Sequence, residues 1–163
     1  MDKKGYKITV GGIVKKDNSI LLVKHGYGHT RGRWDFPRGY VEIDESIEAA
    51  VIREVYEETS IKATPIGIIG IRHMLQTLNE NDVSNELLTI WELKYEEGNP
   101  RPDGREIIEV AFFQVDELLN SPEIGGWTKE IVSSSLFSKG LKNSTYFPKT
   151  HPKGTIYWKS YLG

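Results

Sequence analysis

The strongest candidates for catalysis or metal binding are acidic residues that lie close together in the first half of the chain. Glu54, Glu57 and Glu58 are three and four positions apart, so they share one face of a helix with 3.6 residues per turn. Like charges at this spacing destabilise an isolated helix by roughly 0.2–0.5 kcal/mol per pair. A hard divalent cation takes oxygen ligands and would neutralise them. The spacing therefore predicts a metal site, with a solvated acidic helix face as the alternative.

The order of residues around these acids is more specific than their number. The segment from Gly39 to Ile61 resembles the Nudix box, G-x5-E-x7-R-E-U-x-E-E-x-G-U with U aliphatic, of the MutT-like Nudix hydrolase family. The chain differs from this motif only at the last glycine, where it has Ser60. That position falls at an expected helix end, where glycine suits a left-handed backbone better than serine. The residues in register are Gly39, Glu45, Arg53, Glu54, Val55, Glu57, Glu58 and Ile61.

The resemblance implies a role for each residue of the box. Mg²⁺ or Mn²⁺ would be held by the backbone carbonyl of Gly39 and by the carboxylates of Glu54, Glu57 and Glu58. Arg53 would orient Glu54 through charge-assisted hydrogen bonds, and Glu45 would brace the site. Glu54 is the first candidate for the general base. Members of the family also use an acid from a later loop, for which Glu109 is the first candidate and Glu106 the second.

The reaction implied by the resemblance is hydrolysis of a phosphoanhydride bond. A carboxylate-held metal ion supplies positive charge at the phosphates and lowers the pKa of bound water. The expected partner is a small nucleotide-type molecule, namely a nucleoside diphosphate linked to a nucleotide, a sugar or another group. Two alternatives stay open: a Nudix-like nucleotide-sensing module without catalysis, against which the intact acids argue, and an RNA 5′-end pyrophosphohydrolase.

The residues just before the box are candidates for substrate binding. Arg31 and Arg33 lie in a glycine-rich segment, and cations on such a backbone suit a loop over phosphates. A solvated connection is the alternative. Trp34 or Phe36 could stack on a base. Arg38 replaces the first glycine of the family's usual W-x-L-P-G-G run, as in branches with P-K-G or P-R-G, and could contact a phosphate or lie at the rim.

The elements around the box predict a layered α/β (α+β) fold. A helix from about Ser46 to Thr59 places an apolar stripe on a sheet and leaves its acids at the edge. Strands are expected at Tyr6–Lys15, Ile20–Val23, Ile66–Ile71, Leu87–Tyr95 and Ile107–Val115. Further helices are expected to start at Asp116 and Trp127, and Gln76–Glu86 is expected to be a polar loop. The resemblance implies a mixed β-sheet sandwiched between helices.

Composition narrows the class of protein. The chain has 163 residues, of which 38% are hydrophobic and 27% charged, as expected for one domain with a substantial core. It has no cysteine, so a metal would be bound by oxygen or imidazole. No apolar run is long enough to span a bilayer, and Met1–Val10 does not read as a secretion signal. We therefore expect a cytoplasmic protein without a membrane partner.

The last 26 residues differ from the rest. Residues 138–163 contain five lysines, several aromatic residues and no acidic residue. We expect residues 1–137 to form the Nudix domain and this basic aromatic tail to pack on the same domain. Because aromatic and cationic side chains together suit single-stranded nucleic acid, RNA binding by the tail is a less favoured alternative. A homodimer contact is another.

Overall fold

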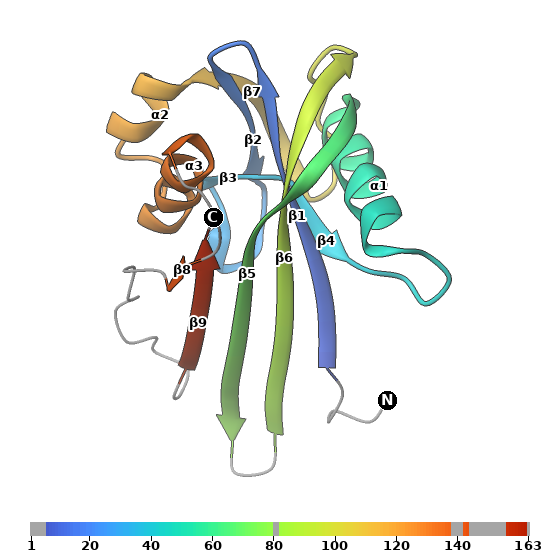
Figure 1. Ribbon diagram of the computed structural model, residues 1–163, viewed down its shortest axis with the longest axis vertical. Coiled ribbons are helices and arrows are strands. Elements are labelled where there is room, and N and C mark those ends of the chain that lie inside the picture. Colours follow the sequence, from blue (N-terminus) through green and yellow to red (C-terminus); the bar gives the residue numbers. More distant parts are fainter. Residues whose placement is uncertain (1–5, 80–81, 138–141, 144–155, 163) are drawn as a thin grey trace.

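The computed structural model describes residues 6–79, 82–137, 142–143 and 156–162. Within these residues, nine strands form one sheet in the order β3-β2-β1-β6-β5-β9-β8, with β4 beside β1 and β7 beside β2 (Figure 1). β1 and β6 run parallel and the other pairs are antiparallel. The strands are β1 (Tyr6–Lys16), β2 (Ser19–His25), β3 (Trp34–Asp35), β4 (Arg38–Tyr40), β5 (Lys62–Asn79), β6 (Asp82–Glu97), β7 (Ile107–Gln114), β8 (Lys142–Asn143) and β9 (Ile156–Leu162).

Helices cover both faces of the sheet, which confirms the predicted mixed sheet between helices. In Figure 1, α1 lies on one side of the sheet, and α2 and α3 lie on the other. No helix in the described ranges is both long and apolar enough to span a bilayer. The helical segments are η1 (Gly28–Thr30), α1 (Ile47–Thr59), α2 (Val115–Asn120) and α3 (Gly126–Phe137).

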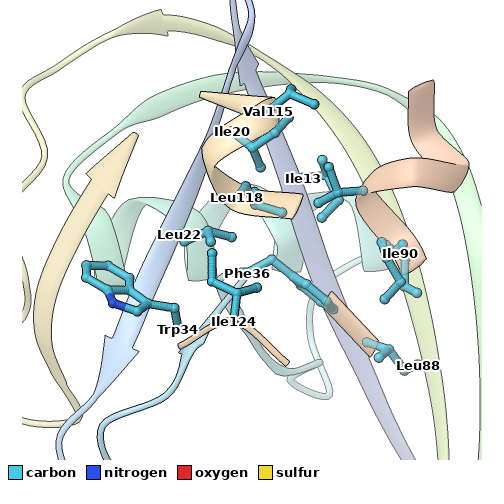
Figure 2. Close-up of a cluster of buried hydrophobic side chains, with 12 residues drawn as sticks. Ile13, Ile20, Leu22, Trp34, Phe36, Leu88, Ile90, Val115, Leu118 and Ile124 are labelled. Carbon is cyan, nitrogen blue, oxygen red and sulfur yellow. The ribbon is translucent and has the colours of Figure 1, made fainter. Parts of the chain in front are cut away.

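Two hydrophobic clusters hold these layers together. Under α1, the helix residues Ala50, Val51 and Val55 are fully buried against the sheet. Under α2 and α3, Phe36 is fully buried in the second cluster, which Figure 2 shows. Burying one Val- or Phe-sized side chain stabilises a fold by about 1.5–3 kcal/mol. The two clusters therefore fix the helices to the sheet and, with them, the side chains that the helices carry.

Gly12 in β1 lets α1 lie unusually close to the sheet. A Cβ atom added there would lie 2.8 Å from Val55 Cγ2 and 2.9 Å from Leu93 Cδ1, which is closer than real Cβ contacts. The helix that makes this close approach is α1, through Val55. Since Val55 follows Glu54 directly, the same contact sets the height of the acidic residues above the sheet.

One sequence-based expectation is wrong. The segment Gln76–Glu86 was expected to be a polar loop, but its main chain continues β5 to Asn79 and resumes in β6 at Asp82. The two strands form a long hairpin that extends away from the helices (Figure 1). Because no helix covers that end, its strands need few apolar side chains, and polar composition does not distinguish them from a loop.

The tail contributes main chain to the same sheet. Strand β9 pairs antiparallel with β5, from Gly70 opposite Leu162 to Gln76 opposite Ile156. The lysine and aromatic side chains of residues 138–163 lie outside the described part of the structure. Their expected packing, and the division of the chain at residue 137, therefore stay predictions.

Ser60 generates a prediction about stability. It ends α1 in the left-handed region, with φ of 59°, where a side chain is strained and glycine is not. We expect Ser60→Gly to raise the free energy of unfolding by about 0.5–1 kcal/mol, measured by urea denaturation. Ser60→Ala keeps the Cβ atom and should give no gain. A Ser60→Gly protein no more stable than the wild type would contradict this account of the helix end.

Candidate active site

The orientation of α1 is fixed at its first turn and along its buried stripe. The Ala49 amide donates to Ser46 Oγ at 3.1 Å, so Ser46 caps the helix. Val51 and Val55 face the sheet. Because these two valines fix the rotation of α1 about its own axis, Glu54 points toward β4 and Glu57 stays exposed.

Arg53 joins three of the four acidic side chains of the box. Its guanidinium donates to both oxygens of Glu45, at 3.1 and 2.5 Å, and to Glu54 Oε1 at 2.7 Å. It also donates to Glu57 Oε2 at 3.2 Å and to the Tyr40 carbonyl at 2.9 Å. We call Glu45, Glu54, Glu57 and Glu58 the acid cluster. The planar guanidinium thus fixes two carboxylates relative to each other and to the end of β4.

Gly39 leaves the space that Glu54 occupies. A Cβ atom added to Gly39 would lie 2.0 Å from Glu54 Cδ and about as close to both carboxylate oxygens. Gly39 is held in register by its pairing with Val10 of β1. The carboxylate of Glu54 therefore rests directly on the backbone of β4, beside the position from which the Gly39 carbonyl would act as a ligand.

Glu58 is the most buried member of the acid cluster. Its side chain accepts a hydrogen bond from the Arg38 amide at 3.2 Å, and the residue is only 8% exposed. Burial first, and then the negative charges of Glu54 and Asp103, raise the pKa of the Glu58 carboxyl to about 8. Burial likewise raises the pKa of Glu54. Both shifts have the same main cause, because burial removes each carboxylate from water and disfavours its charged form.

The donor set fits a hard divalent cation, although the side chains are not preformed around one. Carboxylate oxygens and a carbonyl are the ligands that Mg²⁺ takes, and a cation would offset the buried charge. Among the described residues, no three acidic or histidine side chains converge into a ready metal-binding group. The hydrogen bonds explain this, because Glu54 and Glu57 each direct an oxygen at Arg53 and Glu58 directs one at β4.

The predicted substrate residues lie in two different environments. Arg31 and Arg33 are exposed beside η1, and Arg38 is half-buried with its guanidinium 3.6 Å from Asp35 Oδ2. Trp34 is only 6% exposed, and Phe36 is fully buried in the cluster under α2 and α3. In this structure the two rings belong to the core and present no open face for a base.

The predicted later acid, Glu109, does not lie with the acid cluster. It pairs with Lys24 across β2 and β7 at 2.9 Å. Lys24 Nζ lies 5.5 Å from the Trp34 ring, which belongs to the cluster under α2 and α3. Glu109 is therefore on the sheet face opposite α1. Since strand side chains alternate between faces, a shift of one position decides the side, and the sequence alone did not fix it.

A loop of which the sequence singled out only Glu106 contacts the end of α1, next to Glu58 of the acid cluster. We call residues 98–106 the Asp103 loop. Its Arg101 amide donates to the Thr59 carbonyl at 2.9 Å, directly after Glu58, and Gly98 packs against Ser60. The loop also carries Arg105 and the second candidate acid, Glu106. Asp103-Gly104 could be recognised as a turn, but no spacing rule connects that turn to the box.

The comparisons with known proteins agree with this geometry. The family model described as the NUDIX domain matches residues 5–134. The chain belongs to the Nudix family. A crystal structure of a MutT protein from Methanosarcina mazei Go1 has the same Nudix fold, with a TM-score of 0.62 and 24% identity, covering 77% of this chain and 89% of that one.

Two curated Nudix relatives have named activities. An ADP-ribose pyrophosphatase of Methanocaldococcus jannaschii is 30% identical over 111 residues, covering 68% of this chain and 63% of the relative. The NAD-capped RNA hydrolase NudC of Escherichia coli O157:H7 is 27% identical over 124 residues, covering 76% of this chain and 45% of the relative. The chain thus spans about half to two thirds of the length of these Nudix relatives.

The close contact at Gly39 generates a prediction about metal binding. Gly39→Ala should displace the Glu54 carboxylate and weaken Mn²⁺ binding by about 10- to 100-fold, the usual effect of disturbing the surroundings of a metal ligand. Mn²⁺ titration followed by electron paramagnetic resonance measures this.

The matched control is Gly67→Ala in β5, where an added Cβ meets nothing within 4 Å. It should bind Mn²⁺ like the wild type, and circular dichroism verifies that both variants fold. If Gly39→Ala also binds Mn²⁺ with unchanged affinity, the acid cluster does not hold the metal at Glu54.

Proposed function

We propose that this chain is a metal-dependent pyrophosphohydrolase that cleaves a phosphoanhydride bond in a nucleoside diphosphate linked to another group. One observation carries the proposal. The acid cluster places Glu54 on the backbone of β4 and buries Glu58 beside it, with a single arginine, Arg53, holding Glu45, Glu54 and Glu57. A structural ion-pair network has no need for this excess of partly buried carboxylates, whereas a cation-dependent phosphate site does.

Each residue of the box then has a distinct role. Glu54, Glu57, Glu58 and the Gly39 carbonyl would hold Mg²⁺ or Mn²⁺, which supplies positive charge at the phosphates and a more acidic bound water. Arg53 fixes the direction of Glu54, and Glu45 fixes Arg53.

Glu54 is our assignment for the general base. In that role it would need a water molecule within hydrogen-bond reach.

The proposed substrate class follows the two named relatives. ADP-ribose and the NAD cap both contain adenosine diphosphate joined to a second ribose through the pyrophosphate, so one bond type covers both activities. Exposed arginines lie on two loops, Arg31 and Arg33 after η1 and Arg101 and Arg105 in the Asp103 loop. Arginine binds phosphate oxygens in a bidentate manner, which suits a diphosphate.

A second candidate, hydrolysis at the 5′ end of RNA, is favoured by the similarity to NudC. It predicts RNA binding that weakens steeply with salt. Removing residues 138–163 should then lower RNA affinity if the basic tail takes part. Unchanged RNA affinity of the truncated protein would contradict a role for the tail.

The decisive experiment is a hydrolysis panel with Mg²⁺ or Mn²⁺. It contains ADP-ribose, NAD, sugar nucleotides, dinucleoside polyphosphates and 5′-capped RNA. We expect the wild type to hydrolyse one class, and Glu57→Gln to do so about 100-fold more slowly, because a metal ligand is lost. Glu117→Gln, which removes an exposed acid from α2, is the matched control and should retain full activity.

Two outcomes would contradict the proposal. If nothing in the panel is hydrolysed with either metal but a nucleotide still binds, the chain is a sensing module. If Glu57→Gln hydrolyses the substrate as fast as the wild type, hydrolysis does not use the acid cluster.

A further inference from the structure

Asp35, at the end of β3, is a buried carboxylate outside the acid cluster. Within the described ranges, Asp35 and Glu58 are the two acidic residues that are buried, each being 8% exposed. Burying a carboxylate costs free energy unless a cation or hydrogen bonds compensate for the lost water. Glu58 belongs to the acid cluster, and Asp35 does not. The burial of Asp35 therefore needs an explanation of its own.

One oxygen of Asp35 is bound by uncharged donors. Oδ1 accepts a hydrogen bond from the Phe36 amide at 2.9 Å and another from Thr128 Oγ1 at 2.9 Å. Thr128 lies in α3 and is only 3% exposed, so this bond joins α3 to the chain just before β4. The amide oxygen of an asparagine could accept both hydrogen bonds. These contacts fix the side chain, but they do not require its negative charge.

The other oxygen of Asp35 faces Arg38 of β4. Oδ2 lies 3.6 Å from a guanidinium nitrogen of Arg38, and among the described residues this is the only ion pair that Arg38 makes. Charge-assisted hydrogen bonds between such groups are about 2.7–2.9 Å long. The charge of Asp35 therefore attracts the guanidinium without occupying its N–H groups, which stay available to a ligand.

The main chain places Arg38 at the acid cluster. Its amide donates to Glu58 Oε2 at 3.2 Å, and the next residue, Gly39, carries the Glu54 carboxylate on its backbone. The Arg38 side chain is 30% exposed, so it is partly open to solvent. Arg53 differs, because its guanidinium already donates to three carboxylates. Arg38 is thus a cation beside the cluster whose donors are not used up by it.

We propose that Asp35 is a positioning residue of the candidate site, whose charge holds the Arg38 guanidinium where it binds a phosphate of the substrate. The inference rests on the proposed function, because it assumes that a diphosphate lies at the acid cluster. A planar guanidinium binds two phosphate oxygens at once only when it is correctly oriented. Thr128 fixes the Asp35 carboxylate, so α3, on the sheet face opposite α1, takes part in this orientation.

The test measures binding of adenosine 5′-(α,β-methylene)diphosphate, whose methylene bridge prevents hydrolysis, by isothermal titration calorimetry with Mg²⁺ on the full chain. Asp35→Asn keeps the shape of the side chain and an oxygen acceptor but removes the charge. We expect it to weaken binding by at least about 5-fold, as for residues that act through a direct contact. Arg38→Gln should weaken binding by about 10- to 150-fold, because hydrogen bonds to a charged ligand are lost.

A double-mutant cycle separates positioning from a structural role. Adding Asp35→Asn to the Arg38→Gln protein should cause no further loss of affinity, because Asp35 acts through Arg38. An Asp35 that only supports the fold would weaken binding equally in both backgrounds. Thr128→Val keeps the volume of the side chain and removes its hydroxyl, so it should weaken binding in the wild-type background as well.

Two further measurements keep the test specific. Glu96→Gln is the matched control, because Glu96 pairs with Lys94 at the same distance of 3.6 Å in β6. It should bind the diphosphate like the wild type. Mn²⁺ titration followed by electron paramagnetic resonance should show nearly unchanged metal affinity for Asp35→Asn, because Asp35 is not a proposed ligand. Circular dichroism verifies that each variant folds.

The inference is overturned if Asp35→Asn binds the diphosphate as tightly as the wild type or more tightly, if its effect persists in the Arg38→Gln protein, or if the wild type does not bind the diphosphate. A Thr128→Val protein with wild-type affinity would overturn the part assigned to α3. Failure of the proposed function looks different. Binding that depends on Asp35 and Arg38, without hydrolysis of any panel member, would contradict the hydrolase and support the role of Asp35. Hydrolysis with wild-type affinity in Asp35→Asn would do the reverse.

Discussion

The site depends on one guanidinium placed among more carboxylates than it can neutralise. Arg53 fixes Glu45 and Glu54 and contacts the end of β4, so the charges are ordered before any ligand arrives. An arginine in a fixed fork loses little conformational freedom when it binds two acids. Burial raises the carboxyl pKa of Glu54 and Glu58, which means that their charged forms are disfavoured here, and a divalent cation would favour those charged forms.

Two close glycine contacts, the buried face of α1 and one loop place that network. Gly12 lets α1 approach the sheet, and the buried Val51 and Val55 fix the rotation of the helix. Gly39 then leaves room for the Glu54 carboxylate on β4. The Asp103 loop connects the end of α1 to the segment after β2. Both segments are therefore positioned relative to the helix that carries Glu54, Glu57 and Glu58. Preorganisation of this kind suits charge stabilisation in phosphoanhydride cleavage.

The sequence predicted the parts of the site that depend on helical spacing and missed those that depend on contacts between loops. The sequence predicted a helix from about Ser46 to Thr59 that carries the acids and ends near Ser60, because these features follow from local periodicity and helix-end chemistry. Glu109 was misplaced because the sheet face of a strand residue depends on register. The place of the Asp103 loop was missed because its contact with α1, from Arg101 to Thr59, joins residues far apart in sequence. The β5–β6 hairpin was missed because polar strands resemble loops.

The central claim is that the acid cluster and the Gly39 carbonyl bind a divalent cation. Crystals grown or soaked with saturating Mn²⁺, with anomalous diffraction measured near the manganese edge, test it most directly. The account predicts an anomalous peak within coordination distance of carboxylate oxygens of Glu54, Glu57 and Glu58, with Arg53 still bound to Glu45. An anomalous map with no peak at these residues, or with manganese only elsewhere on the chain, would contradict the account.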